Sequence, residues 1–533
     1  MLCFEPFLCA TLSILFYFVC LAITHFVYQC SPAKNIVMEQ KNKRQCRRQN
    51  EGESQYDIIV IGSGVVGSAM ASALARDGRS VLCIERDLNE PDRIVGELLQ
   101  PGGVEKLHEL QMEDCLEGID SPKMNGYGVF YDGQQVDLRY PENADGSQPY
   151  GRSFHYGRFV SNLRRHATKQ ENCTMVQGTV MKFIEEDAVD CDKRTVRGVT
   201  YQRDDGTIVQ VRASLTIVAN GAGSSLTKCL NDAKPIIPSH FIGLKMKNAA
   251  LKLPCQWRGN VFMVDPSPVL MYPISSTDVR VLVDYPGKKL PNIANGDMQK
   301  YLLQEVMPQL PECIHQDYRD TVLSGDIRTV PNREMASQPV FKLRGAMLLG
   351  DAFNCRHALT GGGMTVGLSD VVLLRDLLSK VEDLDVFEDV EENILPAFYH
   401  KRRTVSSTIN ILANALYAIF APNHCSSKNG NMVSFIRSSV VRYFKIGGVC
   451  ESGPVGLLAG LVKSPYVLLI HFFSVAFVGC WDQLAPFPTL GGIYKSIQLL
   501  QSAVWIVGPL IAEEGLLKFV FPPYIFKRNK DSC

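Results

Sequence analysis

The chain has 533 residues, 46% of them hydrophobic, and its 55 basic and 55 acidic residues balance to a net charge of zero. This length exceeds one ordinary domain and predicts two soluble lobes plus membrane elements, while the even charge argues against a nucleic-acid binder. The 17 cysteines form no C-x-x-C pair and no H-E-x-x-H motif is present, so we expect reduced thiols in a cytosol-facing protein and no metal site.

The N-terminal stretch, residues 6–28, contains no Asp, Glu, Lys or Arg. At about 1.5 Å per residue it is long enough to cross the hydrocarbon core of a bilayer, about 30 Å thick. Positive charge follows this apolar run, whereas a cleavable signal peptide carries it in front. The pattern predicts a transmembrane anchor over 1–30 and a basic flexible tether over 31–55, with the folded part in the cytosol. The basic residues are Lys34, Lys41, Lys43, Arg44, Arg47 and Arg48.

A glycine-rich turn follows the first predicted strand, within residues 56–87. Gly62, Gly64 and Gly67 have the G-x-G-x-x-G spacing between an apolar strand and a helix, and a second strand ends at Glu85. The first glycine permits the tight turn, the second lets the backbone approach a pyrophosphate, and the third lets helix and strand pack closely. Glu85 would accept hydrogen bonds from the adenosine ribose. This βαβ unit predicts a dinucleotide site but does not separate FAD from NAD.

A second motif lies far downstream, where an apolar strand over residues 346–349 leads to Asp351 and then to glycines 361–363. We expect a helix to begin at about Met364, beside Gly363. The Asp351 carboxylate can hold ribityl hydroxyls, and the helix N-terminus can face the pyrimidine edge of a flavin. The alternative is an ordinary turn before a glycine-rich cap. Together with the first motif the arrangement favours FAD, because a plain NAD dehydrogenase needs no second sugar-binding element.

Three apolar runs occupy the C-terminal part, at residues 453–462, 466–481 and 493–512. The first two are short for a membrane span and are separated around Pro465, which favours a helical hairpin in one leaflet. The alternative is a pair of buried core helices.

Both flavin motifs belong to a wider set of segments that resembles the plant form of the squalene monooxygenase (squalene epoxidase) family. The most specific are GELLQPGG, at residues 96–103, and GDAFNCRHALTGGGMTV, at residues 350–366. The resemblance implies an α/β FAD-dependent monooxygenase fold and conversion of squalene to (S)-2,3-epoxysqualene with O₂ in sterol and triterpenoid synthesis. It also implies an endoplasmic reticulum membrane location, with electrons from NADPH through NADPH-cytochrome P450 reductase.

The resemblance also implies a division of the chain. A Rossmann-like FAD-binding domain is expected over 56–235 and 335–385, a mixed-sheet substrate domain over 236–334, and a helical membrane-associated region over 386–533.

Carried over by position, the resemblance assigns FAD contacts to both motifs and to the segments between them. Without it, each of the arginines could equally be a surface ion-pair partner, and Tyr127 would be a core aromatic. Gln100 and Tyr127 are expected to meet beside the flavin and the substrate, because a Tyr hydroxyl at an apolar pocket needs a polar partner. The FAD contacts are Val65, Val66, Glu85, Arg86, Arg93, Arg164, Val180, Asp351 and Met364.

The sequence departs from the family pattern at several positions. Asn220 replaces a usual Asp and is followed by an altered segment over 222–230, Ala358 replaces a proline, and Cys355 replaces a methionine. These changes leave three readings open. The chain is an epoxidase, a prenyl reductase or ring hydroxylase of the same fold, or a divergent paralogue that binds a terpenoid or partner without turnover.

Overall fold

The computed structural model describes residues 55–94, 96–187, 194–287, 289–338, 342–384, 389–421 and 430–515. The chain divides into two units, Met1–Glu53 and Ser54–Cys533, and the described residues belong to the second. The predicted N-terminal anchor and tether lie outside the described residues.

The first lobe is built on a seven-stranded sheet with the order β8-β2-β1-β11-β10-β9, to which β17 adds beside β11. Its central strands pair in parallel, and β9 and β10 add in antiparallel fashion. Helix α2 (Val65–Arg76) packs against α4 (Tyr156–Thr168) and α8 (Gly363–Leu378). The strands are β1 (Tyr56–Ile61), β2 (Val81–Glu85), β8 (Cys173–Gln177), β9 (Thr179–Glu186), β10 (Thr195–Gln202), β11 (Ile208–Val218) and β17 (Ala346–Leu348).

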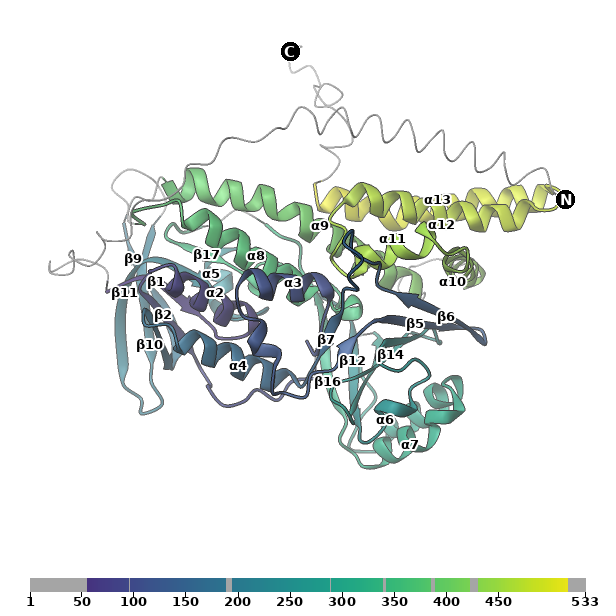
Figure 1. Ribbon diagram of the computed structural model, residues 1–533, viewed down its shortest axis with the longest axis horizontal. Coiled ribbons are helices and arrows are strands. Elements are labelled where there is room, and N and C mark those ends of the chain that lie inside the picture. The colour runs from purple at the N-terminus through teal and green to yellow at the C-terminus, as the bar shows by residue number, and fades with distance from the viewer. Residues whose placement is uncertain are drawn as a thin grey trace, which may run out of the picture. The chain divides into compact units, whose positions relative to one another are not determined.

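The second lobe contains another seven-stranded sheet, with the order β16-β12-β15-β14-β13-β5-β6. Figure 1 shows the helices α6 (Asp297–Tyr301) and α7 (His315–Leu323) below this sheet and the C-terminal helices above it. Two of its strands, β5 and β6, come from within the range 56–235 expected for the FAD domain. The strands are β5 (Gly126–Tyr131), β6 (Gln134–Arg139), β12 (Ile236–Met246), β13 (Gly259–Phe262), β14 (Val269–Pro273), β15 (Val279–Pro286) and β16 (Arg328–Glu334).

A small three-stranded sheet joins the segments between the two lobes. It pairs β3 (Leu98–Leu99) with β7 (Gly151–Ser153), which also pairs with β4 (Lys123–Met124). Helix α3 (Pro101–Glu109) follows β3 directly and packs on α8. The GELLQPGG segment therefore lies at the junction of the lobes.

In the described residues 395–421 and 430–515, the C-terminal part consists of the helices α9 (Leu395–Phe420), α10 (Gly430–Lys445), α11 (Val449–Leu458), α12 (Pro465–Leu484) and α13 (Leu490–Glu513). Pro465 is the first residue of α12, where its missing N–H costs nothing, so it starts a helix and does not kink one. Helices α12 and α13 run side by side and form an antiparallel hairpin (Figure 1). The predicted hairpin therefore joins the second and third apolar runs, whereas the sequence had suggested the first and second.

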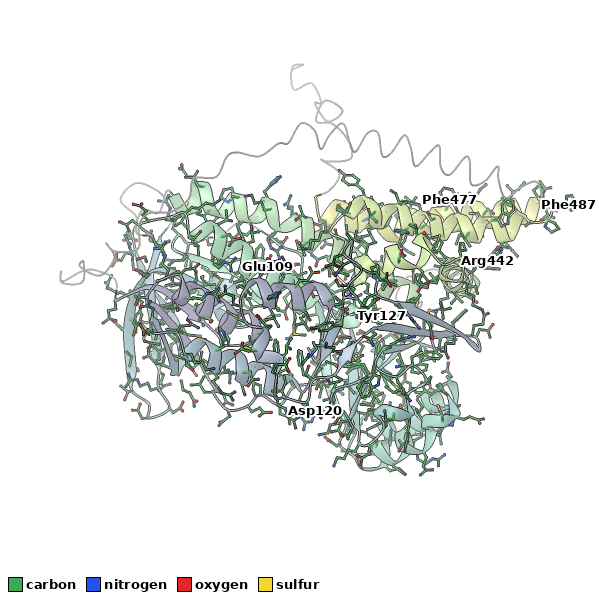
Figure 2. The ribbon with its side chains drawn as sticks, in the orientation of Figure 1. Glu109, Asp120, Tyr127, Arg442, Phe477 and Phe487 are labelled. Carbon is green, nitrogen blue, oxygen red and sulfur yellow. The ribbon has the colours of Figure 1, made fainter. Side chains whose placement is uncertain are left out.

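Helices α12 and α13 are long and apolar enough to cross a membrane, yet only 28% and 22% of their most apolar windows are buried. This exposure does not fit the alternative of a buried core pair, because core helices cover their apolar residues. Figure 2 shows Phe477 and Phe487 along this hairpin. The most exposed apolar side chains include Leu490 at 88%, Phe487 at 80% and Trp505 at 72%.

Candidate functional site

The glycine-rich turn connects β1 to α2 as predicted. Gly62 has φ of +96°, and a Cβ there would lie 2.8 Å from the Cα of Asn220. A Cβ on Gly67 would lie 1.8 Å from the Gly62 carbonyl oxygen. At Gly64, by contrast, a Cβ would meet only the Tyr156 hydroxyl, at 3.8 Å, among the described residues. The protein fills the space beside the first and third glycines and leaves it open beside the second, which fits a dinucleotide pyrophosphate.

Glu85 and Arg164 brace this turn. The Glu85 carboxylate accepts a 2.6 Å hydrogen bond from the Ser63 backbone N–H. The buried Arg164 guanidinium donates to the carbonyl oxygens of Ser63 and Asn89, at 3.0 and 2.9 Å, and lies 3.8 Å from Glu85. Arg164 therefore fixes the shape of the turn through its carbonyls, a role that the sequence did not reveal.

Asp351 follows β17, on the other side of the turn. Its side chain is accessible to solvent, yet it is surrounded by protein, and this desolvation raises the pKa of its carboxyl group. Solvent therefore reaches a carboxyl group that protein atoms surround. Within the described part of the chain its carboxylate accepts no side-chain hydrogen bond. It is therefore free to accept hydrogen bonds from a ligand, and its contact with sugar hydroxyls stays a prediction.

Val66 packs the two motifs together. A Cβ on Gly350 would lie 3.2 Å from the Val66 side chain, and one on Gly367 would lie 2.5 Å from it. Glycine at position 367 lets α8 approach α2 closely, and glycine at position 350 lets the turn after β17 approach the same Val66 side chain. The first turns of both helices, which begin at Val65 and Gly363, thus lie close together, and the partial positive charge at each N-terminus favours an anionic ligand.

Tyr156, the first residue of α4, was not singled out in the sequence. Its ring lies 3.3 Å from the position of a Cβ on Gly96, and the Arg93 guanidinium stands 6.0 Å from the ring centre. Burial raises the pKa of the phenol, and the charges of Arg93, Asp351, Arg164 and Glu85 also act on it. Glu85, Arg93, Arg164 and Asp351, four charged residues that the resemblance assigned to FAD, therefore lie near a single phenol, and the space between them and the turn at Gly64 is called the cleft.

The remaining predicted contacts differ in their exposure. Arg86 is exposed, directly after β2. Val180 in β9, together with Met364 in the first turn of α8, is partly buried against the core of the first lobe.

Gln100 lies at the start of α3 and is fully buried. Its Oε1 accepts hydrogen bonds from the hydroxyls of Tyr127, at 2.6 Å, and Tyr140, at 3.0 Å, and its Nε2 donates to the Thr360 carbonyl oxygen at 2.8 Å. Burial raises the pKa of Tyr127 to about 12, so the phenol keeps its proton at physiological pH. The predicted pair is thus part of a larger set, which holds the glycine-rich loop through Thr360. Tyr140 escaped sequence reasoning because only folding brings it to Gln100.

His357 anchors the other end of that loop. Its Nδ1 accepts a 3.2 Å hydrogen bond from the Leu359 N–H, and its Nε2 lies 3.0 Å from the Ser239 hydroxyl, which donates to the buried Asp284 carboxylate at 2.5 Å. The ring also stacks on Tyr417, with centroids 3.7 Å apart. These contacts restrain the loop although Ala358 stands where the family has proline.

Asn220 and Cys355 also have defined surroundings. The Asn220 amide nitrogen donates a 2.8 Å hydrogen bond to Ser224 Oγ, which caps helix α5 (Ser225–Leu230) by accepting from Leu226 N–H. Asparagine thus uses its amide donor in this turn, a group that the usual aspartate lacks. Cys355 is buried, and burial raises the pKa of its thiol to about 12, so it is a packing residue and not a reactive one.

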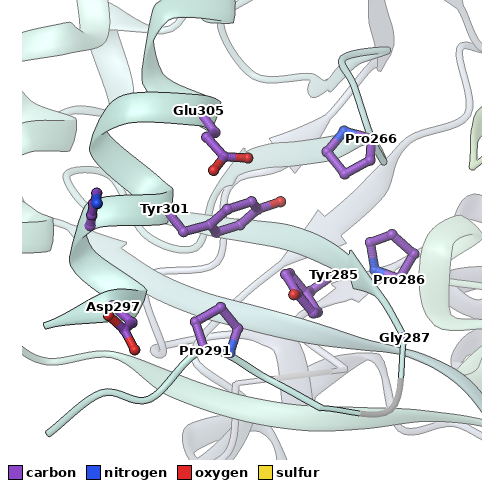
Figure 3. Close-up of a pocket in the computed structure, with 9 residues that line it drawn as sticks. Pro266, Tyr285, Pro286, Gly287, Pro291, Asp297, Tyr301 and Glu305 are labelled. Atoms are coloured by element: carbon purple, nitrogen blue, oxygen red, sulfur yellow. The ribbon is translucent and has the colours of Figure 1, made fainter. Parts of the chain in front are cut away.

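Two cavities lie outside the cleft. One, of about 600 Å³, opens beside α6 in the second lobe and is lined by none of the predicted residues (Figure 3). The other is an apolar cavity of about 70 Å³ between the helices α9 to α13. Ile436, Val440 and Leu499 line it and belong to the same apolar cluster as Tyr127. Apolar packing is therefore continuous from Tyr127 to the exposed hairpin.

Comparison with known proteins agrees with this geometry. Residues 212–497 match the family model of squalene epoxidase. The chain is 46% identical to squalene epoxidase 3 of Arabidopsis thaliana, over 88% of this chain and 86% of that protein. It is 45% identical to squalene monooxygenase SE1 of Panax ginseng, over 88% of this chain and 84% of that protein.

A solved structure shares the fold at low identity. PqsL of Pseudomonas aeruginosa, described as a probable FAD-dependent monooxygenase, superposes with a TM-score of 0.54 and 18% identity, covering 69% of this chain and 96% of that one. The predicted α/β FAD-dependent monooxygenase fold is confirmed. With the family model and the plant relatives, the conclusion is that this chain belongs to the squalene epoxidase family.

Proposed function

We propose that the chain inserts one oxygen atom of O₂ into squalene to give (S)-2,3-epoxysqualene, with FAD as cofactor and NADPH as the source of electrons. The observation that carries this proposal is the buried set of Gln100, Tyr127 and Tyr140. It joins the loop expected at the flavin to an apolar region that continues to the exposed hairpin. An apolar alkene needs such surroundings and no charged nucleophile.

Residues of the two motifs suit three parts of FAD. The open space at Gly64 and the N-terminus of α2 suit the pyrophosphate, Glu85 suits the adenosine ribose, and Asp351 suits the ribityl chain. When bound, FAD supplies the chemistry that activates O₂ for transfer to an alkene. Replacing Asp351 by Ala should weaken FAD binding roughly tenfold, because a hydrogen bond to a charged group contributes about 1.5 to 3 kcal/mol. Unchanged FAD affinity would contradict the assignment of the downstream motif.

The residues Gln100, Tyr127 and Tyr140 act by position. Both phenols donate to Gln100, and burial raises the pKa of Tyr140 as well as that of Tyr127, so neither transfers a proton at physiological pH. Their rings form an edge-to-face pair with centroids 5.8 Å apart. This pair gives the reacting alkene an apolar wall and keeps water from the place where oxygen is transferred.

Squalene reaches this wall from the membrane side, through the region of the cavity between α9 and α13. Ala503 lines the cavity and is 5% exposed, whereas its neighbour Val504 is 55% exposed. Ala503→Phe should fill the cavity and raise KM for squalene severalfold, with flavin content unchanged. Val504→Phe adds a ring on the outer face and is the matched control. Equal KM values for both variants would contradict this route.

We assign the folded part to the cytosolic face of the endoplasmic reticulum membrane, with NADPH-cytochrome P450 reductase as the electron donor. The basic residues after the predicted N-terminal anchor support this orientation. The sequon Asn172-Cys173-Thr174 tests it, because Asn172 is exposed and an oligosaccharide could be attached there in the lumen. The chain should show no glycosidase-sensitive mass in intact cells, with Asn172→Gln as control. Glycosylation of Asn172 would overturn the orientation.

Product analysis tests the activity itself. Microsomes that contain this chain, given squalene, NADPH and reductase, should form 2,3-epoxysqualene. A hydrogenated or ring-hydroxylated product would favour the other enzymes of this fold. A purified protein that stays colourless after FAD is added would favour the non-catalytic paralogue.

A further inference from the structure

Arg356 is a buried cation with unused hydrogen-bond donors. Its side chain is 7% exposed, and its Nη2 donates to the carbonyl oxygen and to Oδ1 of Asn354, both at 2.9 Å. Its Nε and Nη1 have no hydrogen-bond partner among the described residues. Leaving the donors of a charged group unpaired inside a protein is strongly unfavourable. A bound anion would satisfy these donors.

The unused donors lie beside a helix N-terminus. A Cβ on Gly363, the first residue of the 16-residue helix α8, would lie 3.8 Å from Arg356 Nη1. The free N–H groups of the first turn add partial positive charge at the same place. Desolvation lowers the pKa of Arg356, and Asp351 is the main charge that opposes this shift. An anion bound here would meet two independent sources of positive potential.

The guanidinium is held in place from behind. Asn354 Oδ1, which accepts from Arg356, also accepts a 3.1 Å hydrogen bond from the Asn410 amide in α9. The same amide donates to the Glu514 carboxylate at 2.8 Å. This chain of hydrogen bonds fixes one edge of the guanidinium and leaves the other edge free.

A second buried arginine in the same region shows the contrast. Arg402 in α9 forms a two-point ion pair with the buried Asp370, at 3.1 and 2.8 Å, so its charge is neutralised within the protein. Arg356 has no such two-point carboxylate partner in the described part of the chain. Its charge is therefore the one available to a ligand.

We propose that Arg356 and the N-terminus of α8 form an anion site for the pyrimidine ring of the flavin, and that this site binds the ring more tightly after two-electron reduction. The proposal rests on the proposed function, because it requires bound FAD. The other anionic part of FAD, its pyrophosphate, is accounted for by the open space at Gly64 and the N-terminus of α2. One FAD can reach both places, since Val66 packs α2 against α8.

The test is the reduction potential of FAD bound to the full chain, together with the dissociation constant of oxidised FAD. Arg356→Gln retains a donor for Asn354 and removes the charge, and Arg356→Met removes both. Either variant should lose at least about tenfold in its preference for reduced over oxidised FAD, equivalent to a potential about 30 mV lower. Arg356→Lys should recover most of the loss. The double variant Arg402→Met/Asp370→Asn is the matched control, since it removes a buried arginine together with its paired carboxylate and leaves the net charge of the region unchanged, and it should leave the potential nearly unchanged.

The outcomes separate the two levels of the argument. Wild-type protein that binds FAD, with potentials unchanged in the Gln and Met variants, would overturn this inference and leave the proposed function standing. Equal weakening of oxidised and reduced FAD would place Arg356 at the pyrophosphate and would also overturn it. Wild-type protein that binds no FAD would overturn the proposed function itself.

Discussion

Gln100 donates a 2.8 Å hydrogen bond to the carbonyl oxygen of Thr360, a residue 260 positions later in the chain. This bond joins the segment that starts α3 to the loop that starts α8. Because Gln100 also accepts from Tyr127, a change on the substrate side is transmitted directly to the loop expected at the flavin.

Removing the Tyr127 hydroxyl should reduce turnover without removing FAD. Tyr127→Phe deletes the 2.6 Å hydrogen bond to Gln100, but Tyr140 still satisfies Oε1. We expect kcat to fall about tenfold, the effect of roughly 1.4 kcal/mol, with unchanged flavin content. Gln100→Leu should lower kcat further, because it removes the acceptor of two buried phenol hydroxyls. A Phe variant that is as impaired as Gln100→Leu would contradict the positioning role.

Tyr156 should contribute to FAD affinity. Its hydroxyl is the only described group near the open side of Gly64, and the predicted charged contacts surround its ring. Tyr156→Phe should weaken FAD binding by a few-fold, in line with about 1 kcal/mol for one hydrogen bond, and Tyr156→Ala should weaken it further. Fluorescence titration of the FAD-free protein measures this. Tyr150→Phe is the control, because it removes the hydroxyl of a ring that lies 4.2 Å from the Lys123 ammonium. Identical affinity in Tyr156→Ala would exclude the residue from the site.

Asn220 should tolerate the acidic residue that is usual in the family. In Asn220→Asp the carboxylate can accept from the Ser224 hydroxyl while Ser224 still accepts from Leu226 N–H, so the turn keeps its shape. We expect turnover at saturating FAD to change by a few-fold at most. A gain above about a hundredfold, equivalent to nearly 3 kcal/mol of barrier, would show that the missing charge matters more than the hydrogen bond.

Glu334 should make stability fall as the pH rises. Burial, and then the negative charge of Glu513, raises the pKa of Glu334 to about 7. The folded state therefore holds a proton that the unfolded state releases near the ordinary value of about 4.3. The stability that this proton contributes is fully present below the unfolded-state pKa of about 4.3 and is lost as the pH rises through about 7.

Thermal unfolding measured between pH 5 and pH 8 tests this prediction. The free energy of unfolding of Glu334→Gln should exceed that of wild type by on the order of 1 to 3 kcal/mol at pH 8 and by little at pH 5. Glu312→Gln, at an exposed position, should follow wild type at both values. If the stability of Glu334→Gln fell with pH as steeply as that of wild type, another group would be responsible for the pH dependence.

Sequence reasoning succeeded where a feature depends on neighbouring residues. The turn at Gly62 to Gly67 and the helix that begins at Gly363 follow from local glycine spacing and apolar strands. The apolar C-terminal helices were also predictable, although the partner of α12 in the hairpin proved to be α13. Pro465 was misleading because a proline at the first position starts a helix as readily as it breaks one.

The sequence could not reveal contacts that only folding creates. Tyr140, Tyr156 and Arg356 carry no motif, and their importance appears from what lies beside them in space. The same holds for strands β5 and β6, which precede the expected substrate domain in the chain but complete its sheet. A strand's sheet partners are set by long-range packing, which a single sequence does not show.

The central claim is that this chain transfers oxygen from O₂ to squalene. The most direct test uses purified, FAD-loaded full-length protein in lipid vesicles with reductase, NADPH, squalene and ¹⁸O₂. The account predicts 2,3-epoxysqualene that carries one ¹⁸O atom, with the second atom released as water. A preparation that holds FAD and consumes NADPH but gives unlabelled epoxide, a hydrogenated polyene or no squalene product would contradict it.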